Sequence, residues 1–83
     1  MTRQEFIKKW CWAPETASDC HQITWDLLED IRETLEDETL TNDTAVGAIC
    51  YDIDNLLEVI DKTTPDYAFW LKLKADLESE YKL

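Results

Sequence analysis

Residues 43–62 read DTAVGAICYDIDNLLEVIDK, and this stretch decides the fold. Its apolar residues recur every three or four positions, which is the spacing of one face of an α-helix. They are Val46, Ile49, Cys50, Ile53, Leu56, Leu57 and Ile60. The pattern predicts a core helix from near Asp43 to Lys62. Gly47 lies inside it at a cost of about 1 kcal/mol relative to alanine, so we expect a close helix crossing there.

The preceding segment predicts a second, amphipathic helix. We expect it to begin between Glu15 and Asp19, with Thr16 or Ser18 as the N-cap, and to run to about Asp37. One side carries apolar residues at helical spacing, namely Ile23, Leu27, Leu28, Ile31 and Leu35. The other faces carry acids, namely Asp26, Glu29, Asp30, Glu33, Glu36 and Asp37. One side of this helix therefore packs and the other is charged.

Two further helices are indicated at the ends of the chain. Thr2, followed three residues later by Glu5, fits a capping box, which predicts a short helix over residues 3–12. Thr64 as N-cap and Pro65 at the first helical position predict a last helix that reaches about Tyr81. The apolar side of this last helix consists of Phe69, Trp70, Leu73, Leu77 and Tyr81, which leaves Leu71 at the edge of the core or exposed.

Composition limits the fold class. One glycine and two prolines in 83 residues leave little material for hairpins and glycine-rich loops. We expect a single all-α domain over residues 1–83, a compact bundle of about four helices with a short first helix. The three cysteines lack the paired spacing of a disulfide framework, which favours reduced thiols in a cytosol. Neither a membrane span nor an export signal is indicated.

Catalytic and metal chemistry find little support in the sequence. Cys11, Cys20, His21 and Cys50 are the four candidate zinc ligands, but only Cys20 and His21 are close in sequence, whereas zinc sites use close ligand pairs. The segment Asp52 to Asn55 opens like a calcium loop but lacks its glycine. His21 is the only histidine available as an imidazole base. We therefore expect no enzyme activity, no metal site and no cofactor.

The acidity is localised. Between Asp26 and Asp43, eight carboxylates face one cation, Arg32, in a chain of formal charge −11. Ordinary solvated helices interleave lysine with glutamate to gain a few tenths of a kcal/mol per pair. This helix does not, so mutual repulsion opposes folding. Either the charge only keeps a small domain soluble, or the carboxylates imitate the phosphates of a nucleic acid.

Imitation of this kind would require a basic partner and would exclude nucleic acid as a direct ligand. The partner-binding residues would be the six acids of residues 26–37, because these give about two charges per helical turn. Acids of the next helix and its end would assist them, namely Asp52, Asp54, Glu58 and Asp61. Aromatic anchors supply most of the affinity of protein interfaces. Trp12 and Trp25, which lie off the predicted apolar stripes, are the candidate anchors.

Small size, strong acidity, surplus aromatic residues and the lack of a catalytic motif resemble the phage and mobile-element inhibitors of bacterial defence, notably anti-CRISPR and anti-restriction proteins. The resemblance is one of class and rests on no single motif. It implies a protein-binding inhibitor of a nucleic-acid-handling nuclease, such as a CRISPR effector in the host cytoplasm. Two alternatives stay open: an immunity protein or antitoxin against a basic nuclease, and a non-catalytic helical adaptor or dimerisation domain. The oligomeric state is not determined by the sequence.

Overall fold

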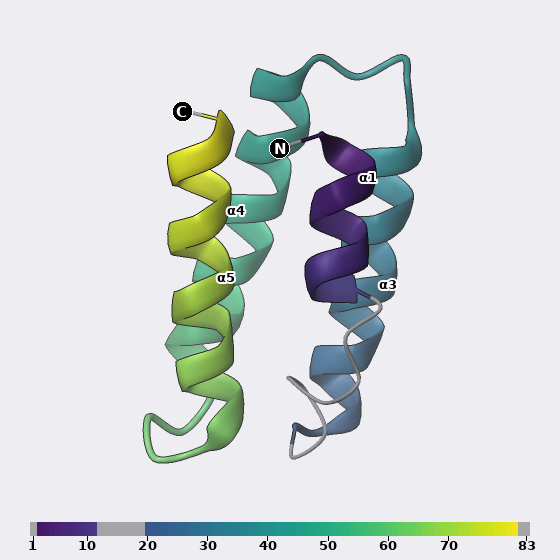
Figure 1. Cartoon of the computed structure of the whole chain (residues 1–83). Coiled ribbons are helices and arrows are strands. Elements are labelled where there is room, and N and C mark those ends of the chain that lie inside the picture. The colour runs from purple at the N-terminus through teal and green to yellow at the C-terminus, as the bar shows by residue number, and fades with distance from the viewer. Residues whose placement is uncertain (1, 12–19, 82–83) are drawn as a thin grey trace.

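The computed structural model describes residues 2–11 and 20–81, and within these two ranges the chain is helical with no β-strand. Its elements are α1 (Arg3–Phe6), the π-helical turn η1 (Ile7–Cys11) that continues it, α3 (Gln22–Glu36), α4 (Asn42–Val59) and α5 (Pro65–Tyr81). The predicted all-α fold of about four helices with a short first helix is confirmed (Figure 1). None of these helices is long and apolar enough to cross a lipid bilayer.

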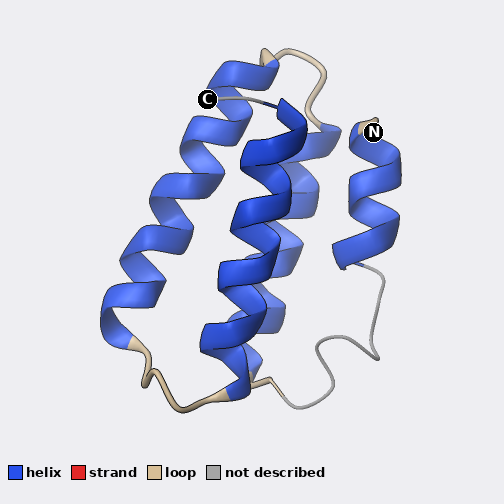
Figure 2. Cartoon of the chain, turned by 60° about the vertical axis from the view of Figure 1, so that its left-hand side comes forward, coloured by secondary structure: helices blue, strands red, loops and turns tan. Residues whose placement is uncertain are grey.

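Consecutive helices run antiparallel and form an up-and-down bundle (Figures 1 and 2). The first helix, α1 with η1, packs against α3, and α4 packs against both α3 and α5. Trp10 of η1 closes the bundle on the remaining side, because its ring meets Phe69 of α5 edge-on at a centroid distance of 5.6 Å. The Cα radius of gyration is 12.0 Å, close to the value of about 12 Å expected for a compact domain of this length.

The helices share one apolar core. α4 buries Val46, Ile49, Cys50, Ile53 and Leu56, and α5 buries Phe69, Trp70, Leu73 and Leu77. These are the predicted faces, with Leu57 and Ile60 partly buried beside them. Leu71, which was expected either at the edge of the core or exposed, is exposed. The side chain of Tyr81 lies outside the described part. Each large apolar side chain buried here contributes about 1.5–3 kcal/mol.

Two helix starts are as predicted. The hydroxyl of Thr2 accepts a hydrogen bond from the Glu5 backbone N–H at 3.1 Å, and the Glu5 carboxylate accepts one from the Thr2 N–H at 3.1 Å. This is the complete capping box. At the other end of the chain, Thr64 Oγ1 accepts from the Tyr67 N–H at 3.4 Å, with Pro65 at the first helical position. Both starts depend on residues that are neighbours in sequence.

The predicted start of the second helix is wrong. α3 begins at Gln22, with His21 as N-cap in an extended backbone conformation. No side chain of its own sequence caps this end. The buried Asp66 of α5 instead accepts a hydrogen bond from the His21 backbone N–H at 2.9 Å. A tertiary contact thus replaces the local cap, and the proposed caps Thr16 and Ser18 lie outside the described residues.

Two details of the predicted packing are also wrong. Ile23 was placed in the core, but 53% of its surface is exposed, because the neighbouring Thr24 faces inward and is fully buried. Gly47 does not mark a close helix crossing, since a Cβ atom built on it would have no heavy atom within 4 Å.

The end of α4 comes earlier than the predicted Lys62. The helix stops at Val59, and Ile60 has an extended backbone. Asp61 then accepts hydrogen bonds from the Thr63 N–H at 2.9 Å and the Thr63 hydroxyl at 2.8 Å. An aspartate that binds the backbone two residues ahead favours a turn over a continued helix.

Arg3 ties the first helix to the far end of α3. Its guanidinium donates to the backbone carbonyl oxygens of Leu35 at 3.3 Å, Asp37 at 3.0 Å and Leu40 at 2.6 Å, and to Asn42 Oδ1 at 2.9 Å. The last turn of α3 contains no basic residue. A cation is favourable at a helix C-terminus, where carbonyl groups lack partners within the helix. Arg3 therefore caps α3 from another helix.

Candidate functional site

All six acids predicted on α3 and at its end are exposed. At 100° per residue they do not form one uniform face. Glu29 and Glu36 lie on the flank that faces the first helix, whereas Asp26, Asp30 and Glu33 follow the crest of α3 at spacings of four and three residues. The contacts of the two groups differ accordingly.

The flank is largely neutralised. Arg32 lies between the two glutamates and forms ion pairs with Glu29 at 3.6 Å and with Glu36 at 3.1 Å. Its side chain is about three-quarters covered, with 24% exposed. The single cation of this helix is therefore committed to two of the six acids.

Asp37 has a structural role at the end of α3. Its side chain accepts hydrogen bonds from the hydroxyl and the backbone N–H of Thr39. These two bonds, from the hydroxyl first and then the N–H, hold the pKa of Asp37 below its usual range. The carboxylate thus forms the turn toward α4, and it is not equivalent to the crest acids.

Asp26, Asp30 and Glu33 form what we call the acidic ridge. Among the described residues, no Lys, Arg or His side chain pairs with any of the three. Asp26 accepts a hydrogen bond from the uncharged side chain of Gln22, with Nε2 at 3.0 Å. The ridge is therefore the part of α3 whose charge is not offset within the described protein.

A shallow groove of about 440 Å³ runs beside the ridge, between α3 and α4. Leu27 and Leu56 form its apolar base, and Asp26, Asp30, Asp52 and Asn55 line its walls. At one end two aliphatic side chains border it, Ile23 of α3 and Val59 of α4, which are 53% and 77% exposed. The groove thus joins a cluster of three carboxylates to an exposed apolar pair.

Three carboxylates elsewhere in the bundle have cationic partners. Lys74 pairs with Asp54 and with Glu78, and Lys9 pairs with Asp76 at 3.0 Å. These contacts lie along α5 and its borders with α4 and η1. Outside α3 and the groove, five further acids are exposed without an ion pair in the described ranges, namely Glu5, Glu38, Asp43, Glu58 and Asp61. Unbalanced charge is therefore densest over the ridge and the adjoining groove.

The two predicted aromatic anchors have different outcomes. Trp12 lies outside the described residues. Trp25 is half-buried against the core and lines a separate cavity of about 510 Å³ between η1 and α3, together with Cys11 and Arg32. This cavity is on the opposite flank of α3 from α4. Trp25 therefore does not belong to the groove.

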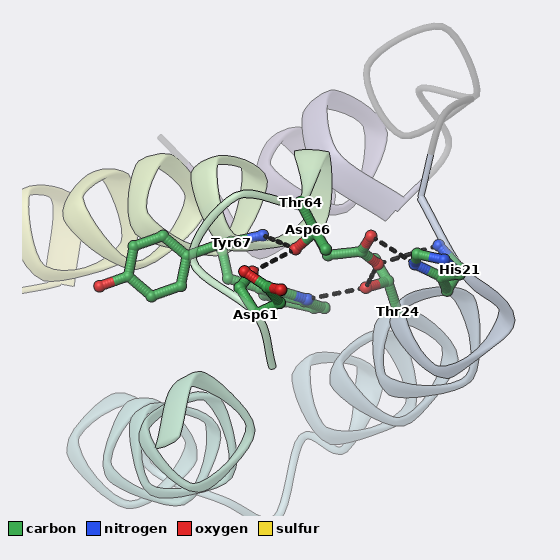
Figure 3. A network of polar contacts seen from close by, with 7 residues as sticks. His21, Thr24, Asp61, Thr64, Asp66 and Tyr67 are labelled. Carbon is green, nitrogen blue, oxygen red and sulfur yellow. Dashed lines mark hydrogen bonds and ion pairs between the residues drawn. The ribbon is translucent and has the colours of Figure 1, made fainter. Parts of the chain in front are cut away.

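A buried polar network joins the start of α3 to the start of α5 (Figure 3). Asp66, with 1% of its surface exposed, accepts from the His21 N–H and ring and from the Thr24 hydroxyl at 2.5 Å. Thr24 Oγ1 accepts in turn from Trp70 Nε1 at 2.9 Å. Burial raises the pKa of Asp66, but the hydrogen bonds from Thr24 and His21 outweigh it and lower the pKa overall.

This network is saturated by its own contacts and is structural. Its only exposed member is the imidazole of His21, whose side chain is 71% exposed. Among the described residues, no group of three or more His, Cys, Asp or Glu side chains is placed to hold a metal ion. The groove between α3 and α4, rather than this network, is the candidate site for a partner.

Sequence reasoning missed two parts of this site. Val59 lies off the predicted apolar stripe of its helix. Its absence from that stripe could have predicted its exposure. Ile23 matched the stripe at helical spacing, so periodicity alone misplaced it. Asp52 was expected to assist the acids of α3, but its exact place beside Asp26 and Asp30 depends on how α3 and α4 align, which no local pattern specifies.

No family model matches the chain, and neither a curated protein nor a solved structure gives a significant match. The function is therefore argued from the geometry of the ridge and the groove.

Proposed function

We propose that the protein is a stoichiometric inhibitor that binds the basic nucleic-acid-binding surface of a nuclease, such as a CRISPR effector. The acidic ridge would occupy the place of a nucleic-acid strand and so block the binding of guide or target. The inhibitor has no catalytic step in this proposal. Its effect depends on forming a one-to-one complex.

One observation supports this function best: the three ridge carboxylates lie next to one another on α3 without a cationic partner in the described ranges. Five other acids do have such a partner, namely Glu29, Glu36, Asp54, Asp76 and Glu78. A charge that serves only solubility gains from local pairing with lysine or arginine. Charges left unpaired side by side cost folding free energy, and a cationic partner surface would offset that cost on binding.

The spacing of the ridge is suited to a channel that accepts nucleic acid. Asp26 and Glu33 are seven residues apart, or roughly 10 Å along the helix axis. Three charges over that length give one charge per about 5 Å, compared with about 3.4 Å along one strand of a duplex. The linear charge density is therefore within a factor of two of a single strand.

A paired set of variants tests the proposal. Asp30→Asn with Glu33→Gln removes two ridge charges, and Glu38→Gln with Glu58→Gln removes two exposed charges elsewhere. All four acids lack ion pairs in the described ranges, so both variants should fold with similar stability. Phage plating on cells with an active CRISPR system, and target cleavage by purified effectors and restriction nucleases, would then be compared.

We expect the native protein to raise plating and to inhibit one nuclease at equimolar ratio, with weaker inhibition as salt is added. The ridge variant should lose potency by about tenfold or more, which corresponds to about 1.4 kcal/mol, and the control variant should lose little. Failure of the native protein to inhibit any nuclease of the panel would refute the function. Equal losses in both variants would refute the role of the ridge.

A further inference from the structure

We infer that the groove between α3 and α4 receives a basic amphipathic helix of the partner protein, with an aliphatic side chain seated at one end and cations along the rest. This inference deepens the proposed function and rests on it, because it specifies the part of the partner that is bound. The occupant is argued from the shape of the groove and from the order of its apolar and charged residues.

The shape of the groove favours a helix over a small molecule. Small-molecule pockets enclose most of their ligand, whereas this groove is shallow and open to solvent along two antiparallel helices. A row of side chains from a third helix fits between two packed helices, as ridges fit into grooves. Binding of an amphipathic helix in such a groove is a recurring mode of recognition.

The apolar end supplies an anchor point. Ile23 lies at the start of α3 and Val59 at the end of α4, so the antiparallel pairing brings both to the same end of the groove. Most of the surface of each side chain is exposed. Leu27 and Leu56 continue this apolar surface along the base of the groove. A leucine or similar side chain at this end would cover exposed aliphatic carbon.

The charged part follows directly along the same groove. Asp26 lies three residues beyond Ile23 on α3, and Asp30 lies one turn further, roughly 6 Å along the axis. Asp52 of α4 lines the groove with them. None of these three carboxylates pairs with a cation in the described ranges. Arginine or lysine at one and two turns from the apolar anchor would therefore meet unpaired acids.

The occupant is thereby specified as a helix with a leucine at one position and cations about four and seven residues away on the same side. A strand of nucleic acid would not satisfy this order, because it has no aliphatic group for the Ile23 and Val59 end and its phosphates repel the carboxylates. A second copy of this chain would also bring like charges together across the ridge.

A synthetic peptide tests this occupant without the nuclease. The probe is an 18-residue, end-blocked helical peptide of leucine, arginine and alanine with leucine and arginine on one face. The control peptide has the same composition but places leucine and arginine on opposite faces. Binding to the full chain is measured by fluorescence anisotropy, and backbone amide resonances locate the contact.

We expect one-to-one binding of the peptide that carries leucine and arginine on one face, at least tenfold tighter than binding of the control peptide, with the largest resonance changes at Ile23, Asp30, Asp52 and Val59. Val59→Ser should weaken binding several-fold, whereas Leu71→Ser, a matched change of an exposed aliphatic residue on α5, should not. Equal binding of both peptides, or indifference to Val59→Ser, would overturn the inference.

The inhibitor function and the helix bound in the groove can be refuted independently. A nuclease that is inhibited through the ridge, together with no facial preference between peptides, would refute only the helix in the groove. Selective peptide binding at Val59, together with no inhibited nuclease, would refute the inhibitor function and leave a docking site for a basic helix.

Discussion

The ring Nδ1 of His21 lies 2.9 Å from Oδ1 of Asp66, although the two residues are 45 positions apart in the sequence. The other oxygen of this carboxylate accepts from the His21 backbone N–H and the Thr24 hydroxyl. Asp66 thus provides the N-terminal cap that α3 lacks in its own sequence. The starts of α3 and α5 are held together by one buried side chain.

Asp66→Asn should destabilise the fold by about 2–4 kcal/mol at neutral pH, because an amide NH₂ would face donors that now meet a carboxylate. Urea unfolding monitored by circular dichroism would measure the loss. The pKa of Asp66 is lowered in the folded state, so its contribution is present above the unfolded pKa, which is about 3.9. It is lost as the pH falls through the folded value. As the pH is lowered, the free energy of unfolding should therefore fall less in the variant than in the native protein. Parallel plots of the free energy of unfolding against pH would contradict this.

Arg3→Ala should cost about 1–3 kcal/mol, because four acceptors at the end of α3 and the start of α4 lose a charged donor. Arg3→Lys should restore only part of this, since an ammonium group cannot reproduce the planar fork of a guanidinium. Lys8→Ala is the control, an exposed cation of the same short helix with a change expected within about 0.5 kcal/mol. Thermal melts of the three variants would rank them, and equal losses for Arg3→Ala and Lys8→Ala would exclude a capping role.

Gly47→Ala should stabilise the protein. Gly47 lies inside α4, and the added methyl group meets no atom within 4 Å. The gain should be about 0.5–1 kcal/mol, or a rise of about 2–8 °C in Tm for a chain of this size. The neighbouring Ala48→Gly should have the opposite effect. A lower Tm for Gly47→Ala would mean that space near this position is needed for a contact beyond the described chain.

The cysteines should react with iodoacetamide at different rates. Burial raises the pKa of the Cys11 thiol to about 11, despite the opposing effect of Arg32, and it also raises the pKa of Cys50. At pH 8 only about one Cys11 thiol in a thousand would be ionised. Cys20 is less buried and should be alkylated first. Peptide mapping over time would show this order, and urea should abolish it; rapid native labelling of Cys11 would contradict its burial.

Helix starts were predictable where the cap lies beside the helix in sequence. Thr2 with Glu5, and Thr64 with Pro65, are local signals, and the structure contains both caps. The start of α3 was not predictable, because its cap comes from Asp66. The role of Arg3 was hidden for the same reason, since its four acceptors, three of them backbone carbonyl oxygens, lie more than 30 residues away.

The candidate site was predictable in part. Periodicity correctly predicted exposure of the acids on α3, because the apolar stripe leaves only the outer faces for charge. It did not separate Glu29 and Glu36, which Arg32 neutralises, from the ridge acids. That separation depends on the reach of one long side chain. The aliphatic end at Ile23 and Val59 required knowledge of the helix ends, which are the least regular part of any helical pattern.

The hydrogen bonds of Arg3 stabilise the bundle without using the acidic side chains on the outer surface of α3. Three of its four acceptors are backbone carbonyl oxygens, and every residue type offers that group. Ridge positions such as Asp30 and Glu33 are exposed, and their carboxylates form no ion pair within the described residues. Residues on the outer surface of α3 can thus be substituted while the helical bundle is retained. Under the proposed function, such a division would let the protein adapt to a target whose own surface changes, because acids of α3 could change without loss of the bundle.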